Sequence, residues 1–517
     1  MSASMQRSTE SQGVMSEVQL PCGRTLQNRL VKAAMYEHLA SFLGGPPNDM
    51  HFALYSRWAS GDWGMIITGN VQVASNQLGL GRDVVVPDVV NEESVQPFKK
   101  LASIIHDEDT HTMHSDTRSK SLAIMQISHT GRQSPNFLGG RLPFVPPKAP
   151  SAIPLDLKTK RHSKLAPLFA YLAQSVFFQT PRAMSLHDIE LVVDQFVKAS
   201  ELAAKAGFDG VQLHAAHGYL ISQFMSQRSN NRMDEFSSKT DPLRFLRKIV
   251  SAIRTSGVVP EDFVLGVKLN AADYVESAAG LVPSEERALE HLRGIASWGM
   301  VDFIEVSGGD YDTPDFLVEA NTSRRQGVFA EFSRRAVQTL TVENVCPPGK
   351  ARPLIMLTGG LHSTELMTSA LARNHADLVG LARVATHDPE LPKHIAEDAS
   401  APLQNVFPFH GPFPQTTLPL RYTVERIVTV FLATLWGALP DAAKPEIPTL
   451  IGAGTETARY SILLRALARK EERTYYTGEG LAINMRFWWY IAPGPWRFGI
   501  WLAILTAVPI FLFVLSA

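Results

Sequence analysis

Eight short apolar runs that alternate with amphipathic stretches constrain the fold of this chain more than any other feature. They lie between about residues 28 and 395, and the longest helical pattern is 186–206. Apolar runs separated by helices are typical of parallel strands, and eight such units close most naturally into a barrel. We therefore expect an α/β chain with a (β/α)8 TIM barrel, whose strands are 30–35, 65–71, 122–127, 210–214, 264–269, 303–306, 354–358 and 376–381.

The competing fold is an open, doubly wound sheet. That fold predicts a glycine-rich phosphate loop directly after the first strand. Residues 33–40 read AAMYEHLA, without a glycine, so the barrel is preferred.

Composition narrows the class of protein. Lys and Arg total 49 against 50 Asp and Glu, so no excess of cations is present to bind nucleic acid through its phosphates. A hydrophobic content of 45% supplies a core and argues against disorder as the main state. The two cysteines, Cys22 and Cys346, are too few for a disulfide scaffold or a cysteine-only iron–sulfur site, and they favour a reducing compartment.

The two ends of the chain differ from the barrel region. Residues 1–16 are polar, lack a secretory signal and are expected to be disordered. Residues 498–517 are 20 uncharged, largely apolar residues, long enough to cross roughly 30 Å of hydrocarbon, and tryptophans and arginines precede them. We expect a barrel over 17–400, a Pro-rich and helical extension over 401–490, and a single-pass C-terminal membrane anchor. The barrel would face the cytosol, on the endoplasmic reticulum; a buried core helix is the alternative for the apolar run.

Chemistry in such barrels lies on the loops at the carboxyl ends of the strands. The fourth expected strand ends in HAAHGY, which places His214, His217 and Tyr219 in one short loop. Two imidazoles can donate hydrogen bonds to one oxygen while a phenol supplies a proton, which suits a carbonyl substrate. A metal site, which has no convincing third ligand, and purely structural histidines are the alternatives; no metal is expected.

Other strand ends indicate a flat, phosphorylated ring. The amide of Gln126 can both donate and accept hydrogen bonds, as the edge of a heterocycle requires. Lys268 lies in an apolar strand and needs a charged partner, either the ligand or an ion pair within the barrel. Gly308 follows strand six, Gly359 and Gly360 follow strand seven, and strand eight ends in GLAR. The loops after strands seven and eight, backed by Arg383, are where barrels hold a phosphate. FMN fits this description.

Together these motifs resemble the Old Yellow Enzyme family of FMN-dependent ene reductases and NADH:flavin oxidoreductases. The resemblance covers about residues 17–395, and HAAHGYLISQF is its most specific part. The motifs that carry it are NRLVKAAM (28–35), MQISHTGRQSP (125–135), AGFDGVQLHAAHGYLISQFMS (206–226), NNRMDEF (230–236), VKLN (267–270), DFIEVSGG (302–309), LTGGL (357–361) and GLAR (380–383).

The resemblance implies which residues bind the cofactor and the substrate. Gln126 would bond the pyrimidine edge of the flavin, and Lys268 would stabilise the reduced ring by its charge. Tyr36 departs from the family, which often has a small side chain there. The cofactor-binding residues would be Ala34, Met35, Tyr36, Gly69, Gln126, Lys268, Gly308, Gly359, Gly360, Ala382 and Arg383, with His214 and His217 on the substrate carbonyl.

The implied activity is hydride transfer from NAD(P)H, through FMN, to the C=C bond of an α,β-unsaturated carbonyl compound. Tyr219 would be the proton donor, and the substrate would be a small lipophilic enone or enal. The alternatives are an NADH oxidase or quinone-type flavin reductase, and a catalytically silent FMN-binding barrel. Partner enzymes of a pathway, or a second copy of the chain, are possible partners.

Overall fold

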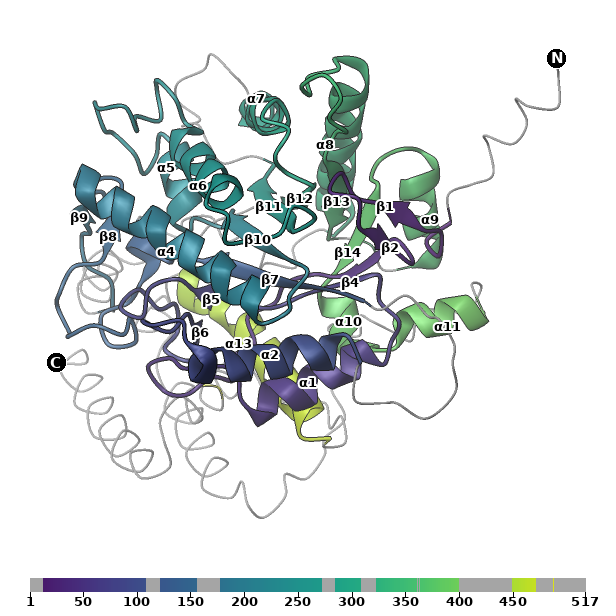
Figure 1. The fold of residues 1–517 in the computed structure, drawn as a ribbon, viewed down its shortest axis with the longest axis horizontal. Coiled ribbons are helices and arrows are strands. Elements are labelled where there is room, and N and C mark those ends of the chain that lie inside the picture. Colours follow the sequence, from purple (N-terminus) through teal and green to yellow (C-terminus); the bar gives the residue numbers. More distant parts are fainter. Residues whose placement is uncertain are drawn as a thin grey trace, which may run out of the picture.

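Eight parallel strands close into a barrel in the computed structural model, which describes residues 13–107, 121–155, 177–271, 284–307, 322–359, 361, 363–398, 449–470 and 487 (Figure 1). The barrel closes because β10 pairs with both β7 and β11. The predicted eight-stranded barrel is therefore confirmed. In chain order its strands are β3 (Leu30–Lys32), β4 (Met65–Ile67), β7 (Leu122–Ser128), β10 (Gly210–Ala215), β11 (Val264–Asn270), β12 (Phe303–Ser307), β13 (Leu354–Thr358) and β14 (Leu378–Leu381).

Helices surround the barrel in an outer ring (Figure 1). The longest predicted helix begins as expected, because the Ser185 side chain caps the backbone N–H of Asp188, and it ends before Gly207, whose φ is +84°. The helices of the ring are α1 (Asp49–Ala59), α2 (Glu92–Ile105), α4 (Leu186–Lys205), α6 (Arg244–Thr255), α7 (Ser284–Ala296), α8 (Thr322–Val342), α9 (Thr364–Ala372), α10 (Arg383–His387) and α11 (Leu391–Glu397).

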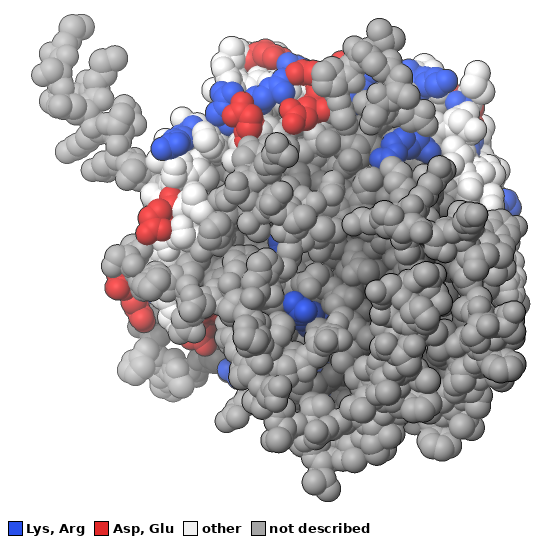
Figure 2. Space-filling model, turned by 180° about the vertical axis from the view of Figure 1, so that it is seen from behind, with Lys and Arg blue, Asp and Glu red and all other residues white. Residues whose placement is uncertain are grey.

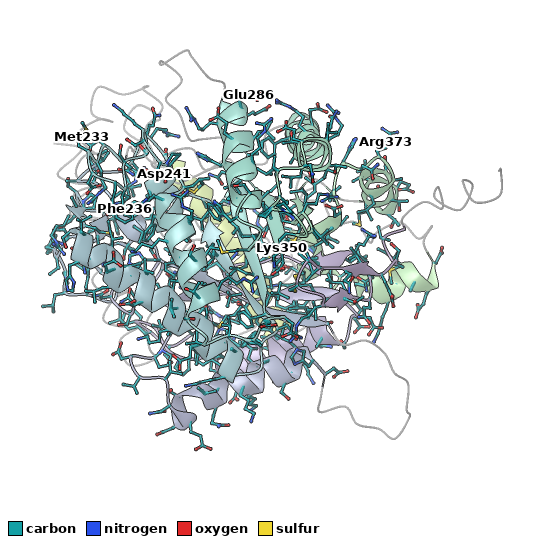
Figure 3. The ribbon with its side chains drawn as sticks, turned by 45° about the horizontal axis from the view of Figure 1, so that its top comes forward. Met233, Phe236, Asp241, Glu286, Lys350 and Arg373 are labelled. Atoms are coloured by element: carbon teal, nitrogen blue, oxygen red, sulfur yellow. The ribbon has the colours of Figure 1, made fainter. Side chains whose placement is uncertain are left out.

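Short elements decorate the two ends of the barrel. At the carboxyl end, β5 pairs with both β7 and β6, and the short helix α5 follows β10. The segment that carries Met233 and Phe236, labelled in Figure 3, comes after α5; Phe236 is buried and Met233 is exposed. These elements are β1 (Val18–Gln19), β2 (Thr25–Leu26), β5 (Val71–Gln72), β6 (Val84–Val85), η2 (Gly131–Gln133), β8 (Lys148–Ala149), β9 (Arg182–Ala183) and α5 (Leu220–Met225).

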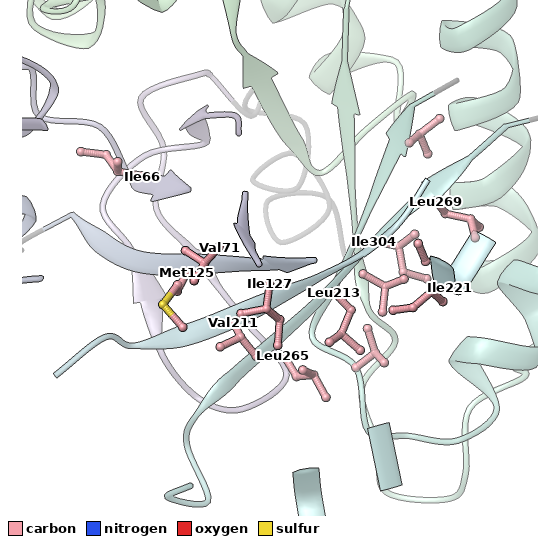
Figure 4. Close-up of a cluster of buried hydrophobic side chains, with 14 of the residues drawn as sticks. Ile66, Val71, Met125, Ile127, Val211, Leu213, Ile221, Leu265, Leu269 and Ile304 are labelled. Carbon is pink, nitrogen blue, oxygen red and sulfur yellow. The ribbon is translucent and has the colours of Figure 1, made fainter. Parts of the chain in front are cut away.

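Strand alternation divides the core into two layers. Outward-facing residues such as Val211, Leu213 and Ile304 pack under the helices (Figure 4). Inward-facing residues, among them Val31 and Phe303, fill the lower part of the barrel. The same alternation turns the intervening polar residues of β10, β11 and β12 into the barrel.

Charged side chains on the described part of the face in Figure 2 are of both signs and lie next to one another. The mixture of signs agrees with the balanced composition.

The structure describes parts of the chain on both sides of the barrel. Residues 13–16, which were expected to be disordered, form a turn with Val14 buried. One helix of the predicted extension, α13 (Thr449–Ala468), packs against α1 and α10. Among the described residues no helix is long and apolar enough to cross a membrane, and 498–517 lies outside them. The prediction of a membrane-anchored barrel is corrected on this finding and is not retained.

Candidate active site

A chain of polar side chains crosses the interior of the barrel near its carboxyl end. Lys268 Nζ lies 3.0 Å from Glu305 Oε1, its neighbour in the strand register. Glu305 Oε2 accepts a hydrogen bond from Gln212 Nε2 at 2.8 Å, and Gln212 Oε1 accepts one from Gln126 Nε2 at 2.7 Å. All four are buried. The ion pair that Lys268 required thus exists inside the barrel, and it orients the lysine and the amide of Gln126.

His214, His217 and Tyr219 come together above this chain, as the sequence predicted. The ring centroid of His214 is 5.1 Å from that of His217 and 4.5 Å from that of Tyr219. His214 Nδ1 accepts the N–H of Ala216 at 3.4 Å, which leaves its proton on Nε2. His214 is also the register neighbour of Lys268. The three side chains can therefore act on one small ligand.

Neighbouring side chains stabilise a strained backbone conformation at His217. Its φ of +56° is uncommon for a non-glycine residue. Asn270 Oδ1 accepts its N–H at 3.2 Å, and Gln133 Nε2 donates to its carbonyl at 2.9 Å. The imidazole Nε2 lies 2.8 Å from Ser307 Oγ. These contacts fix the ring, and strain of this kind concentrates at functional sites.

Both histidines are neutral at physiological pH. Burial lowers the pKa of His214 well below its usual value, and the neighbouring His217 ring and the Lys268 charge disfavour its protonated form further. Burial and the Lys268 charge do the same to the pKa of His217. A neutral imidazole donates one N–H, so the pair can supply hydrogen bonds to an oxygen without carrying charge.

Asn70 contacts the phenol and was missed in the sequence. It follows Gly69 after β4 and is buried, and its Nδ2 donates to Tyr219 Oη at 3.2 Å. Sequence pattern could not pair the two because 149 positions separate them. Glu305 was missed too, although a carboxylate in the apolar strand IEV is as unusual as Lys268 and gave the same signal.

The loop after β3 lies against the end of β4. A Cβ on Gly69 would collide with the Met35 carbonyl and the Glu37 carboxylate, so only glycine fits there. The N–H of Gly69 donates to Glu37 Oε1 and to Tyr55 Oη, each at 2.9 Å, and the Tyr55 hydroxyl also bonds Glu37. Glu37 thereby fixes Gly69 beside Met35, two of the predicted cofactor contacts.

Lys32, at the end of β3, is a second buried lysine, and it lies near Glu37. The sequence pattern did not identify it. It is fully buried, donates to the Ile67 carbonyl at 3.1 Å and lies 4.0 Å from the centroid of the Trp58 ring. Burial lowers its pKa from 10.5 to about 8, and the Glu37 carboxylate opposes the shift. A charged group of this kind is costly in the interior and needs these partners.

Tyr36, the departure from the family pattern, is directed toward the loop that precedes β6. Its hydroxyl donates to Asp83 Oδ2 at 3.3 Å, and Asp83 also accepts from Gln72 and Gly81. Burial raises the pKa of Asp83 despite these bonds.

The predicted phosphate site is described in part. Thr358, at the end of β13, pairs in register with Gly380 of β14. Thr358 Oγ1 is buried without a hydrogen-bond partner in the described part of the chain. Gly359 has φ +106°, and no atom of the described residues beyond its chain neighbours lies within 4 Å of where a Cβ would be. Ala382 and Arg383 follow β14 as expected. An unsatisfied hydroxyl and an open glycine fit a phosphate; Gly308 and Gly360 lie outside the described residues.

A closed parallel barrel with neutral imidazoles, a phenol, a buried lysine and an open glycine at its carboxyl end has the chemistry of a flavin-dependent oxidoreductase. The chain belongs to the NADH:flavin oxidoreductase / NADH oxidase family, whose sequence model matches residues 21–401. FMN is the cofactor of this chain and NAD(P)H is its reductant. Residues 449–470 and Phe487 lie beyond the matched region.

Two curated relatives and one solved structure illustrate the similarity. The NADH-dependent flavin oxidoreductase iliE of Neonectria sp. is 36% identical over 73% of this chain, which spans only 46% of that protein. The NADH-dependent flavin oxidoreductase iccE of Talaromyces variabilis is 34% identical over 73% of this chain and 85% of its own. An Old Yellow Enzyme homologue from Zymomonas mobilis has 21% identity and a TM-score of 0.53, over 75% of this chain and 93% of its own, and supports the fold.

Proposed function

We propose that this chain passes a hydride from NAD(P)H, through FMN, to the C=C bond of an α,β-unsaturated carbonyl compound. The observation that carries the proposal is the group formed by His214, His217 and Tyr219. Two neutral N–H donors beside one phenol suit a substrate whose oxygen gains negative charge while a neighbouring carbon takes a proton.

The two imidazoles bind the carbonyl oxygen. His214 offers its Nε2 proton, because Nδ1 is held by the backbone N–H of Ala216. His217 is fixed through Ser307 and Asn270, and it offers its Nδ1 proton when the Ser307 hydroxyl donates to its Nε2. Because both rings are neutral and already in place, their hydrogen bonds strengthen as charge develops on the oxygen and cost no reorganisation.

Tyr219 delivers the proton to the α-carbon, and Asn70 supports it. A phenol that gives up its proton becomes a phenolate, and the amide N–H of Asn70 already points at that oxygen. This donor stabilises the negative charge left on Tyr219 and lowers the barrier to proton transfer.

The buried, hydrogen-bonded row of Lys268, Glu305, Gln212 and Gln126 would bind the cofactor. When bound, FMN supplies the hydride chemistry, accepting from NAD(P)H and giving to the β-carbon. Lys268 would place its charge at the pyrimidine side, held there by Glu305, and Gln126 would bond that edge, held by Gln212. Thr358, Gly359 and Arg383 would hold the phosphate, with Ala34, Met35, Tyr36, Gly69 and Ala382 in contact through their backbone.

The test measures flavin reduction and flavin reoxidation separately in the variant Tyr219→Phe. Reduction of the bound flavin by NAD(P)H should keep its rate, while anaerobic reoxidation by a simple enone such as cyclohexenone should slow by about 100-fold or more, since a positioned proton donor contributes 10²–10⁴. Equal losses in both half-reactions would contradict the proton-donor role. Reoxidation by oxygen or a quinone, with none by enones in the parent protein, would favour the oxidase alternative.

A further inference from the structure

We propose that the C-terminal segment formed by α13 and Phe487 contributes to FMN binding. It does so by stabilising the loop between β3 and α1 in the conformation that binds the cofactor. This inference rests on the cofactor alone and not on the proposed substrate. The segment lies beyond the region that the family model matches, 21–401.

Two contacts join this segment to one residue of the loop. Arg465, on α13, donates from Nη2 to the backbone carbonyl of His38 at 3.0 Å, a buried hydrogen bond across 427 positions of sequence. The Phe487 ring stacks on the His38 ring with centroids 4.3 Å apart and planes 28° apart. The backbone and the side chain of His38 are therefore both held from the C-terminal segment.

An apolar cluster reinforces the same junction. Ala458, Ile462 and Phe487 are buried together against residues of three loops at the carboxyl end of the barrel, namely Phe42, Leu80 and Leu138. Further along α13, Leu464 and Leu467 join the main core over α1. The helix is thus seated on the barrel by burial, which sets Arg465 at its hydrogen-bonding position.

The loop needs this support because His38 is strained. Its φ is +57°, in the left-handed region that residues other than glycine rarely adopt. Arg82 holds the next part of the loop through the Ala40 carbonyl at 2.9 Å. Met35 and Tyr36, whose backbone is expected to contact the flavin, lie only three and two positions before His38. A relaxation at His38 therefore moves the cofactor-contacting backbone.

Coupling to FMN follows from the equilibrium between two loop conformations. With Arg465 in place, the strained conformation is populated before the cofactor arrives. Without Arg465, the loop relaxes in the apoprotein, and only a minor fraction of molecules keeps the conformation that binds FMN. The apparent affinity for FMN falls in proportion to that fraction. A purely structural tether would change stability and leave that affinity unchanged.

The test measures the dissociation constant of FMN for full-length apoprotein by quenching of flavin fluorescence. Arg465→Ala should weaken FMN binding about tenfold, the equivalent of one weak charge-assisted hydrogen bond. Arg465→Lys, which keeps a cationic donor, should recover part of the loss. Lys470→Ala, an exposed residue just after the same helix, is the matched control and should bind like the parent.

Hydrogen exchange gives a second readout that does not depend on activity. In Arg465→Ala apoprotein, amides of residues 33–45 should exchange faster than in the parent, and saturating FMN should restore their protection. Unchanged FMN affinity in Arg465→Ala, with a lower melting temperature, would overturn the proposal. If that variant does not fold, Phe487→Ala replaces it, with the same expected loss of FMN affinity and the same refuting result.

Discussion

The buried charge of Lys32 gives a prediction about stability that can be worked out in detail. Lys32→Met keeps the length and volume of the side chain and removes the charge, in a site formed by Trp58, Tyr55 and the Ile67 carbonyl. The variant therefore tests the cost of that charge with little change in packing.

The size of the effect follows from the pKa. Burial lowers the pKa of Lys32 in the folded protein to about 8, from 10.5 in an unfolded chain. Between these two pH values the unfolded state binds more protons than the folded state, so the free energy of unfolding rises with pH. The whole rise corresponds to roughly 3 kcal/mol. Below pH 8 both states hold the proton, and this contribution is absent.

The assay compares parent and variant apoproteins by thermal unfolding at intervals from pH 7 to pH 10.5. Other groups titrate in both proteins and cancel in the difference. Stability of the parent relative to Lys32→Met should rise with pH by roughly 3 kcal/mol, equivalent to about 6–12 °C in melting temperature for a large domain. Lys100→Met, at an exposed lysine on α2, is the control and should not show this rise.

A constant difference between parent and Lys32→Met across that pH range would refute the reasoning. It would mean that the folded protein holds the Lys32 proton as firmly as the unfolded chain does. The contacts with Trp58 and Ile67 would then offset burial completely.

Three further predictions concern the site itself. Asn70→Ala removes the donor to Tyr219 Oη and should slow enone-dependent reoxidation about 100-fold, with flavin reduction by NAD(P)H unchanged in stopped-flow measurements; equal slowing would contradict the role of the amide. Lys268→Met should cost about 3–5 kcal/mol in thermal unfolding because it strands the Glu305 carboxylate, and adding Glu305→Gln should recover most of this, whereas simply additive losses would disprove the coupling. Because burial keeps the pKa of His214 well below 6.5, affinity for a phenolic ligand should stay flat from about pH 5.5 to about 8, and a titration near pH 6.5 would show that the ring charges.

The barrel and the centre of the site could be predicted because both depend on local patterns. Each strand is a short apolar run, and HAAHGY places two imidazoles and a phenol in one loop whatever the remaining details. Ser185 and Gly207 likewise mark the ends of α4 through their own side-chain and backbone preferences.

The partners of these residues could not be predicted, because strand register and loop packing decide them. Glu305 meets Lys268 only since β11 and β12 align those two positions. Asn70 reaches Tyr219 from another strand end, and Arg465 reaches His38 across most of the chain. Sequence periodicity gives the inward or outward direction of a side chain, whereas its neighbour depends on the closed barrel.

One experiment tests the central claim most directly: an anaerobic titration of the purified, FMN-loaded protein, followed by its visible absorption. The account predicts one FMN per chain, loss of the yellow colour on adding NAD(P)H, and full return of the colour on adding an enone under nitrogen. Correctly folded protein that takes up no FMN, or that bleaches with NAD(P)H and stays bleached with every enone offered, would contradict it.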